Sequence, residues 1–340
     1  MMITDMPIKN QPLINTTSLW QKLLANAYRD PNSLLKELEL DTNKLSYSEQ
    51  ANQQFKLLAP QSYVAKIQKG NWNDPLLRQI LPINDEMQIT QGFEIDPVGD
   101  DAAMVTNGVL HKYHGRVLLV TTGACAIHCR YCFRRHFPYS DANPAKDNWQ
   151  DALSYIASDS RIEEVILSGG DPLVLSDEKL QSLCFQLAQI PHVKRLRIHT
   201  RLPIVLPERI DKNFLQWFEK IPLQKVMVIH ANHAQELGND VAKVLSHLKS
   251  VNTLLLNQSV LLKGVNDSID ALSNLSECLI ENNVLPYYLH LLDHVQGASH
   301  FKIDDKDAIN LMQQLRDRLS GYMVPKLVRE IKGRASKVPL

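Results

Sequence analysis

The sequence predicts an α/β fold, a partial barrel of parallel strands preceded by a helical region. Its first support is a set of six short apolar runs, at 117–122, 163–168, 193–200, 225–230, 253–262 and 285–292. The last five begin about one βα unit apart, and amphipathic stretches separate them, a pattern typical of parallel strands with right-handed crossovers. Six units predict a partial (β/α)6 barrel or an open α/β sheet, not a closed eight-stranded barrel.

The predicted domains are an N-terminal helical region, 1–90, and the barrel, 91–340. In the first, 18–28 and 31–40 carry apolar residues at helical spacing, and Thr17 or Ser18 is a suitable N-cap. Shorter helical segments follow at 63–68 and 75–81. The helices expected between and after the barrel strands are 176–189, 207–219, 234–249, 268–282 and 304–320. The last apolar segment, 322–331, is either a seventh strand or an edge strand formed where the chain returns to the sheet.

Composition excludes several functional classes. Lys+Arg and Asp+Glu are both 37, so bulk charge would hold neither nucleic acid nor a membrane. No apolar stretch is long enough to span a bilayer, and the first residues do not resemble a signal peptide. Three of the five cysteines fall within eight residues. This spacing favours a metal site in a reducing, cytoplasmic setting over a disulfide framework.

Reactive groups gather just after the predicted strands. They are Cys125 to Cys132, Gly169-Gly170-Asp171, Thr200-Arg201, His230 and Asp293, while Gln258 falls within the fifth run. Because parallel α/β folds place their chemistry at the carboxyl ends of strands, we expect these groups to form one active site.

The strongest single pattern is the C-x3-C-x2-C spacing of Cys125, Cys129 and Cys132. Three thiolates on one loop can hold three irons of a four-iron cluster and leave the fourth iron open to a ligand. A zinc site completed by His128 or His136 is an alternative, and buried structural cysteines are another. Cys184 and Cys278 lie among apolar residues on predicted helices and are expected to be plain hydrophobes.

This arrangement resembles the radical S-adenosylmethionine (SAM) enzymes. Tyr131 and Phe133 flank the third cysteine, and LSGGDP (167–172) is similar to the family's glycine-rich segment after the second strand. The resemblance implies a [4Fe-4S] cluster whose open iron binds SAM, which one electron cleaves to a 5′-deoxyadenosyl radical. It also implies that Ser168, Gly169, Gly170 and Asp171 lie at SAM, where glycines let the main chain approach closely.

A narrower resemblance covers about residues 90–340. CRYCFRRHF, LSGGDPL, RIHTRLPIVLP, HANH, NQSVLLKGVND, YYLHLLDHVQGASHF and GYMVPKLVRE are similar, in this order, to the lysine 2,3-aminomutases. Members of that subfamily also use pyridoxal 5′-phosphate (PLP). The resemblance implies that Lys337 forms the Schiff base with PLP, that Tyr113 and Arg116 contact the phosphate, and that His230 and Gln258 lie near SAM. The chain departs from the subfamily in having KGRASK, with one glycine, before the end of the tail.

The resemblance also implies a substrate site. Arg134 would bind the substrate carboxylate, and Asp293 and Glu330 would bind a distal ammonium group, with Glu330 standing where free-lysine enzymes have aspartate. Two acids at one site favour a lysine side chain over glutamate. Without the resemblance, the local sequence favours a solvated tail lysine for Lys337 and a structural histidine for His230. Glu330 could equally be a solvated charge.

The implied activity is an isomerase, an L-lysine 2,3-aminomutase that converts L-α-lysine to β-lysine. The chain stops three residues after Lys337, as in the shorter bacterial branch that serves translation elongation factor P. The expected partners are therefore free L-lysine, elongation factor P with its lysyl ligase, and a reductant protein. The alternatives are a free-lysine or glutamate 2,3-aminomutase, a non-catalytic zinc protein, and a radical SAM enzyme without PLP.

Overall fold

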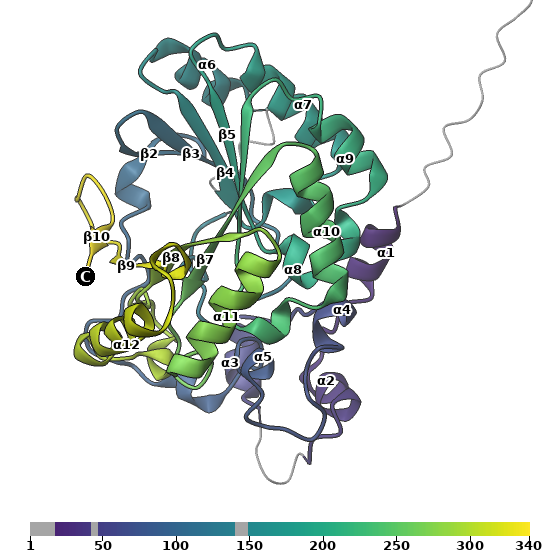
Figure 1. Ribbon diagram of the computed structural model, residues 1–340, viewed down its shortest axis with the longest axis vertical. Helices are drawn as coiled ribbons and strands as arrows, with labels where there is room; N and C mark the ends of the chain where they lie inside the picture. The colour runs from purple at the N-terminus through teal and green to yellow at the C-terminus, as the bar shows by residue number, and fades with distance from the viewer. Residues whose placement is uncertain (1–17, 42–46, 140–148) are drawn as a thin grey trace, which may run out of the picture.

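The strands of the protein form a ten-stranded sheet whose spatial order follows the chain from β1 to β10. The computed structural model describes residues 18–41, 47–139 and 149–340 (Figure 1). The strands are β1 (Met104–Thr106), β2 (Val109–Tyr113), β3 (Arg116–Thr122), β4 (Glu164–Gly169), β5 (Arg195–Thr200), β6 (Gln224–Ile229), β7 (Thr253–Val260), β8 (Leu285–His290), β9 (Lys326–Arg329) and β10 (Val338–Pro339).

Every neighbouring pair from β3 to β9 is parallel. The six predicted strands are thus confirmed, and the segment 322–331 contains a further parallel strand, β9. At the two ends the pairing becomes antiparallel, between β1, β2 and β3 and between β9 and β10. The sheet is curved (Figure 1), and β1 and β10 do not pair with each other, so the barrel stays open between them.

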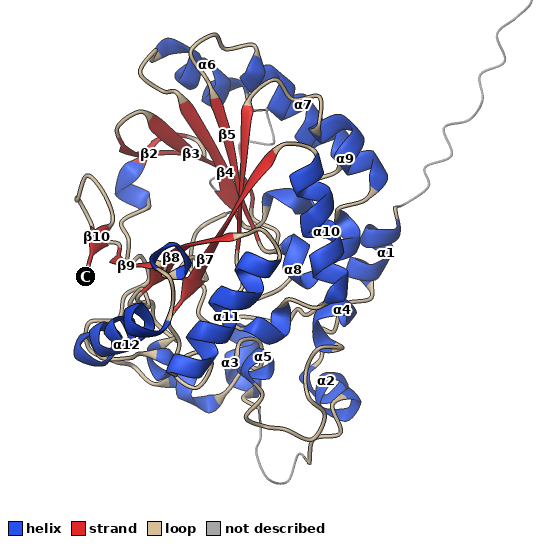
Figure 2. Ribbon diagram, viewed as in Figure 1, coloured by secondary structure: helices blue, strands red, loops and turns tan. Residues whose placement is uncertain are grey.

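Some helices lie along the outside of the curved sheet, and others, near the N-terminus, lie beyond its lower end (Figure 2). The helices are α1 (Leu19–Ala25), α2 (Pro31–Glu37), α3 (Glu49–Gln54), α4 (Gln61–Val64), α5 (Pro75–Arg78), α6 (Gln150–Ser158), α7 (Asp177–Ala188), α8 (Leu202–Val205), α9 (Lys212–Phe218), α10 (Asn239–Ser250), α11 (Ile269–Glu281) and α12 (Asp305–Arg318). Side-chain caps fix several helix starts: the Asp30 carboxylate accepts from two backbone N–H groups at the start of α2, and Ser268 caps α11. The predicted helices are confirmed within a few residues, with three exceptions. The helices predicted to begin at 207 and 234 begin at Lys212 (α9) and Asn239 (α10), and the segment predicted at 63–68 is helical only up to Val64 (α4).

The antiparallel hairpin that β1 and β2 form with β3 was not among the predicted elements, although β3 itself was. Its two turns contain Gly108 and Gly115, both with positive φ (71° and 75°), a conformation that glycine adopts without strain. Asn107-Gly108 is a recognised hairpin signal. The hairpin matters because it carries Lys112, Tyr113 and Arg116 to the edge of the barrel.

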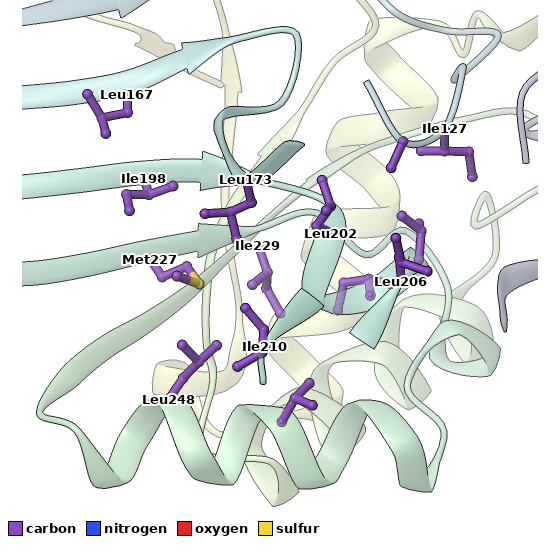
Figure 3. Packing of buried hydrophobic residues seen from close by; sticks show 14 of the residues in the cluster. Ile127, Leu167, Leu173, Ile198, Leu202, Leu206, Ile210, Met227, Ile229 and Leu248 are labelled. Atoms are coloured by element: carbon purple, nitrogen blue, oxygen red, sulfur yellow. The ribbon is translucent and has the colours of Figure 1, made fainter. Parts of the chain in front are cut away.

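Side chains alternate along the strands, as a half-open barrel requires. In β5, Leu196, Ile198 and Thr200 are buried against the helices, whereas Arg197 and His199 are only half-buried and point to the other face. Figure 3 shows Leu167, Ile198 and Met227 from three adjacent strands packed in a layer with Leu248 of α10. This apolar layer leaves the inner face of the barrel free for polar groups.

The same apolar cluster includes Trp20, Leu34 and Tyr63 of the N-terminal region as well as the barrel residues. The N-terminal helices therefore pack directly on the barrel. Within the described residues, no helix is long and apolar enough to cross a membrane.

Candidate active site

Most predicted site residues lie at one end of the barrel, where the parallel strands finish, whereas Tyr113 and Arg116 lie at the turn where β3 begins. Cys125 follows β3, Asp171 follows β4, His230 follows β6, and Asp293 and Glu330 follow β8 and β9. Gln258 lies inside β7, paired with Tyr288 of β8. The parallel pairing from β3 to β9 brings these distant segments together.

The cysteine loop is held by the N-terminal region. The backbone N–H groups of His128 and Arg130 donate to the carbonyls of Leu58 (2.9 Å) and Gln79 (2.9 Å). The Arg130 side chain, which is fully buried, also pairs with Glu86 at 2.5 Å. The loop is thus fixed from outside the barrel, so that its thiols are positioned before any metal binds.

All three cysteines of the loop are free thiols. Burial, with a neighbouring thiol, raises the pKa of Cys125 and raises that of Cys132 to about 11. Thiols in such a site need a metal to become thiolates at neutral pH. Three thiols on a short loop beside an open barrel fit a [4Fe-4S] cluster, in which each thiolate binds a different iron.

The zinc alternative fits less well. In the described part of the chain, no three His, Cys, Asp or Glu side chains lie close enough together to hold one metal ion. His128 instead hydrogen-bonds Lys56 through Nδ1 (2.7 Å), and His136 lies 3.2 Å from the carbonyl of Gln296. Both candidate fourth ligands are therefore engaged with backbone carbonyls.

The cysteine loop requires the two glycines at the end of β4, Gly169 and Gly170. A Cβ atom on Gly170 would lie 2.3 Å from the carbonyl oxygen of Ala124, and one on Gly169 would lie 2.8 Å from that of Thr122. The Gly170 N–H donates to Thr122 (2.7 Å) and the Asp171 N–H to Ala124 (2.8 Å). The glycines thus let β4 and the cysteine loop meet backbone to backbone.

The Asp171 carboxylate holds the end of β5. It accepts from the Thr200 hydroxyl (2.7 Å) and from the backbone N–H groups of Arg201 (2.7 Å) and Leu173 (3.0 Å). Burial raises the pKa of Asp171 to about 6, although these hydrogen bonds oppose the shift. The described contacts of this side chain are therefore structural and fix the strand ends around the site.

Arg134 sits in a buried polar cluster. Its Nε donates to the carboxylate of Asp100 (2.7 Å) and its Nη1 to the hydroxyl of Ser168 (3.3 Å). Lys112 contacts the other oxygen of Asp100 at 2.6 Å. Burial would raise the pKa of Asp100, but Arg134 and Lys112 outweigh it and lower that pKa. Asp100 thus stays ionised and fixes the direction of the guanidinium.

Lys337 is brought to the barrel by the last strand. Val338 in β10 pairs with Arg329 in β9, and the Lys337 ammonium reaches the Glu330 carboxylate at 2.5 Å. Lys112 lies 3.1 Å from the other oxygen of Glu330. Burial opposes ionisation of Glu330, yet the two lysines lower its pKa to about 2.

The pKa of Asp293, unlike that of Glu330, is raised. Burial, with Glu330 close by, raises the pKa of Asp293 to about 7, although Lys337 opposes the shift. A further cation beside Asp293 would favour its ionised form. Tyr113 lies at the β2–β3 turn, where burial, with Glu330 close by, raises its pKa. The Arg116 guanidinium carbon lies 4.7 Å from the Tyr113 ring centre.

The inner face of the barrel carries neutral imidazoles. Gln258 donates to His230 Nε2 at 2.7 Å, and burial, with Arg201, lowers the pKa of His230 to about 3. The Nε2 atoms of His199 and His290 are buried and have no hydrogen-bond partner within residues 18–41, 47–139 and 149–340. Lys337 is among the groups that lower the pKa of both, after burial. Unpartnered buried atoms around Lys337 fit a polar cofactor such as PLP.

Sequence reasoning missed Lys112, Asp100, His199 and His290. His199 could have been found, because it occupies an inward position of a predicted strand near its carboxyl end. Lys112 and Asp100 precede the first predicted strand, where no pattern marked them.

Comparisons with known proteins agree with this geometry. A family described as the Radical SAM superfamily matches residues 119–214. The chain is 48% identical to L-lysine 2,3-aminomutase of Escherichia coli (strain K12), over 96% of each chain. It is 48% identical to the Haemophilus influenzae protein of the same name, over 97% of this chain and 98% of that one. A glutamate 2,3-aminomutase of Clostridioides difficile is 29% identical over 94% of this chain and 75% of its own length.

Proposed function

The chain belongs to the L-lysine 2,3-aminomutase family of radical SAM enzymes, and from this we propose that it moves the amino group of free L-lysine from the α- to the β-carbon. Such an enzyme uses a [4Fe-4S] cluster, SAM and PLP. Together these groups supply a hydrogen-abstracting radical and an electron-delocalising carrier for the amino group.

The observation that carries the substrate proposal is the charge pattern of the site. Arg134 offers a guanidinium for a carboxylate, and its Nε and Nη1 atoms are fixed by Asp100 and Ser168. Asp293 and Glu330 supply negative charge near Lys337. A substrate with a carboxylate at one end and an ammonium group at the other matches this pattern, whereas a glutamate side chain would face two acids.

We assign the remaining roles by position. Cys125, Cys129 and Cys132 would hold the cluster, and Ser168, Gly169, Gly170, Asp171, His230 and Gln258 would surround SAM. Lys337 would carry PLP, and Tyr113 and Arg116 would hold its phosphate. The neutral imidazoles of His199 and His290 add hydrogen-bonding atoms without adding charge. The closely packed strand ends would keep water away from the reacting carbon atoms.

The proposal is tested by turnover under anaerobic conditions. The reconstituted protein is given SAM, PLP, a chemical reductant and either L-lysine or L-glutamate, and the products are separated by chromatography. We expect β-lysine from L-lysine and no β-glutamate. Cys129→Ala should abolish turnover, while Cys278→Ala, which alters a cysteine outside the loop, should not. Formation of β-glutamate but not β-lysine would reject the substrate assignment.

We further propose that the β-lysine serves the cytoplasmic modification of elongation factor P by a lysyl ligase. The similarity to the Escherichia coli and Haemophilus influenzae proteins along nearly their whole length supports this branch. In a strain that lacks the gene, elongation factor P should lose its β-lysyl group, and added β-lysine should restore it. Full modification in the deleted strain would favour a role in free-lysine metabolism instead.

A further inference from the structure

The side chain of Arg201 lies directly behind the cysteine loop. Its Nη1 is 2.7 Å from Sγ of Cys129, and its Nη2 donates to Gln79 (2.7 Å) and Glu236 (2.9 Å). Arg201 follows β5, and its backbone N–H is held by Asp171. A permanently charged donor therefore points at one of the three sulfurs proposed to bind iron.

The surroundings of Arg201 fix this direction. Arg201 is 6% exposed, and its guanidinium carbon lies 5.5 Å and 5.7 Å from the ring centres of Tyr63 and Tyr131. Gln79 and Glu236 are fully buried. With aromatic rings beside it and two acceptors on Nη2, the guanidinium has little freedom to turn away from Cys129.

We propose that Arg201 raises the reduction potential of the cluster by donating a hydrogen bond to the Cys129 thiolate. Hydrogen bonds to the sulfurs and nearby charge set the potential of an iron–sulfur cluster. Reduction adds one negative charge, and the Nη1 hydrogen bond to a ligating sulfur stabilises that charge more than it stabilises the oxidised form. The Glu236 carboxylate, 2.9 Å from Nη2, offsets part of the guanidinium charge, so the directed hydrogen bond is the main source of the effect. Arg201 is thus a positioning and tuning residue, distinct from the thiolates themselves.

The hydrogen bonds of Arg201 also connect the N-terminal region to the cysteine loop. Gln79 lies just after α5, in the N-terminal region, and it accepts from Arg201, Asn232 and Tyr131. Glu236 accepts from Arg201 and from the Asn232 backbone. The N-terminal region therefore reaches the cluster by two routes, through the backbone of the cysteine loop and through Gln79 to Arg201.

The inference rests on the proposed cluster site, and an EPR-monitored redox titration of the reconstituted enzyme tests it. In Arg201→Met the reduction equilibrium should shift at least tenfold toward the oxidised cluster, which is 59 mV for one electron. Arg201→Lys keeps the positive charge but loses the planar guanidinium with its several N–H donors, so its shift in reduction potential should be smaller. The matched control is Arg209→Lys, because Arg209 is also buried between aromatic rings but bonds Leu173 and Asp177. Its potential should equal that of the wild type.

A second measurement does not depend on the Met variant folding. In wild-type enzyme labelled with ¹⁵N-guanidino arginine, pulsed EPR of the reduced cluster should show a ¹⁵N coupling that Arg201→Lys loses, while the couplings of the labelled Arg134 and Arg135 near Cys132 stay. Normal iron content with unchanged potentials, or ¹⁵N couplings identical in the wild type and Arg201→Lys, would overturn the proposal for Arg201 alone. A wild-type protein that binds no iron would instead reject the proposed function.

Discussion

The ammonium group of Lys337 lies 2.5 Å from the carboxylate of Glu330, which Lys112 also contacts at 3.1 Å. The acid proposed to receive the substrate ammonium is therefore already paired with the lysine proposed to carry PLP. If Lys337 carries PLP, its nitrogen is no longer a free ammonium group paired with Glu330. We expect the distal ammonium of L-lysine to take that place, so that cofactor attachment prepares the substrate site.

Glu330→Gln should destabilise the cofactor-free protein. The substitution leaves two partly buried ammonium groups without their shared partner, and such losses cost about 3 kcal/mol. Urea unfolding at pH 7 measures this change. The control is Glu94→Gln, which removes an exposed carboxylate 2.6 Å from Lys332. Surface pairs contribute little, so equal losses in the two variants would contradict the burial argument.

Asp293→Asn should stabilise the cofactor-free protein increasingly as pH rises from 5 to 8. The pKa of Asp293 is raised to about 7. Its contribution to stability is therefore complete below the usual aspartate pKa, near 4, and is lost as pH rises through 7. The neutral amide avoids this loss, which amounts to about 2 kcal/mol or more at pH 8.

The quantity to follow is the difference in free energy of unfolding between Asp293→Asn and the wild type. Buried histidines with lowered pKa values, such as His199 and His290, add a slope of their own in this pH range. They are present in both proteins, so their effect cancels in the difference. A difference that stays constant from pH 5 to pH 8 would show that Asp293 does not titrate there.

Much of the fold could be predicted because its signals are local. The apolar runs from 117 to 292 correspond to β3 to β8, since buried parallel strands need continuous apolar sequence. The β1–β2–β3 hairpin has short strands with mixed burial, so only its Asn107-Gly108 turn carried a signal. Helix α6 lies in the long gap before the second predicted strand and was missed.

The site was predictable only where its residues are close in sequence. The spacing of the three cysteines and the pairing of Gly169 with Gly170 match neither helix nor strand periodicity, so these residues stood out in the sequence. The pairs Lys112–Glu330 and Gln79–Arg201 join residues 218 and 122 positions apart. No periodicity links such partners, because the curvature of the sheet and the packing of the N-terminal helices bring them together.

Lys337→Ala should prevent covalent attachment of PLP while leaving the iron content unchanged. Borohydride reduction of the PLP-loaded protein, followed by peptide mapping, should label the wild-type C-terminal peptide and leave the variant unlabelled. Lys332→Ala is the matched control, because Lys332 lies in the same tail but pairs with Glu94 at the surface. Label that persists in Lys337→Ala would assign the cofactor to a different lysine.

Gly170→Ala should disturb the iron-binding loop more than it disturbs the rest of the barrel. The added Cβ would lie 2.3 Å from the Ala124 carbonyl, and since that atom belongs to the backbone of the cysteine loop, the loop must move. We expect a loss of stability of about 2 kcal/mol or more and markedly less iron per chain after reconstitution. Gly321→Ala is the control, because nothing lies within 4 Å of its added Cβ. If Gly170→Ala binds as much iron as Gly321→Ala, the backbone contact between β4 and the cysteine loop does not position the thiolates.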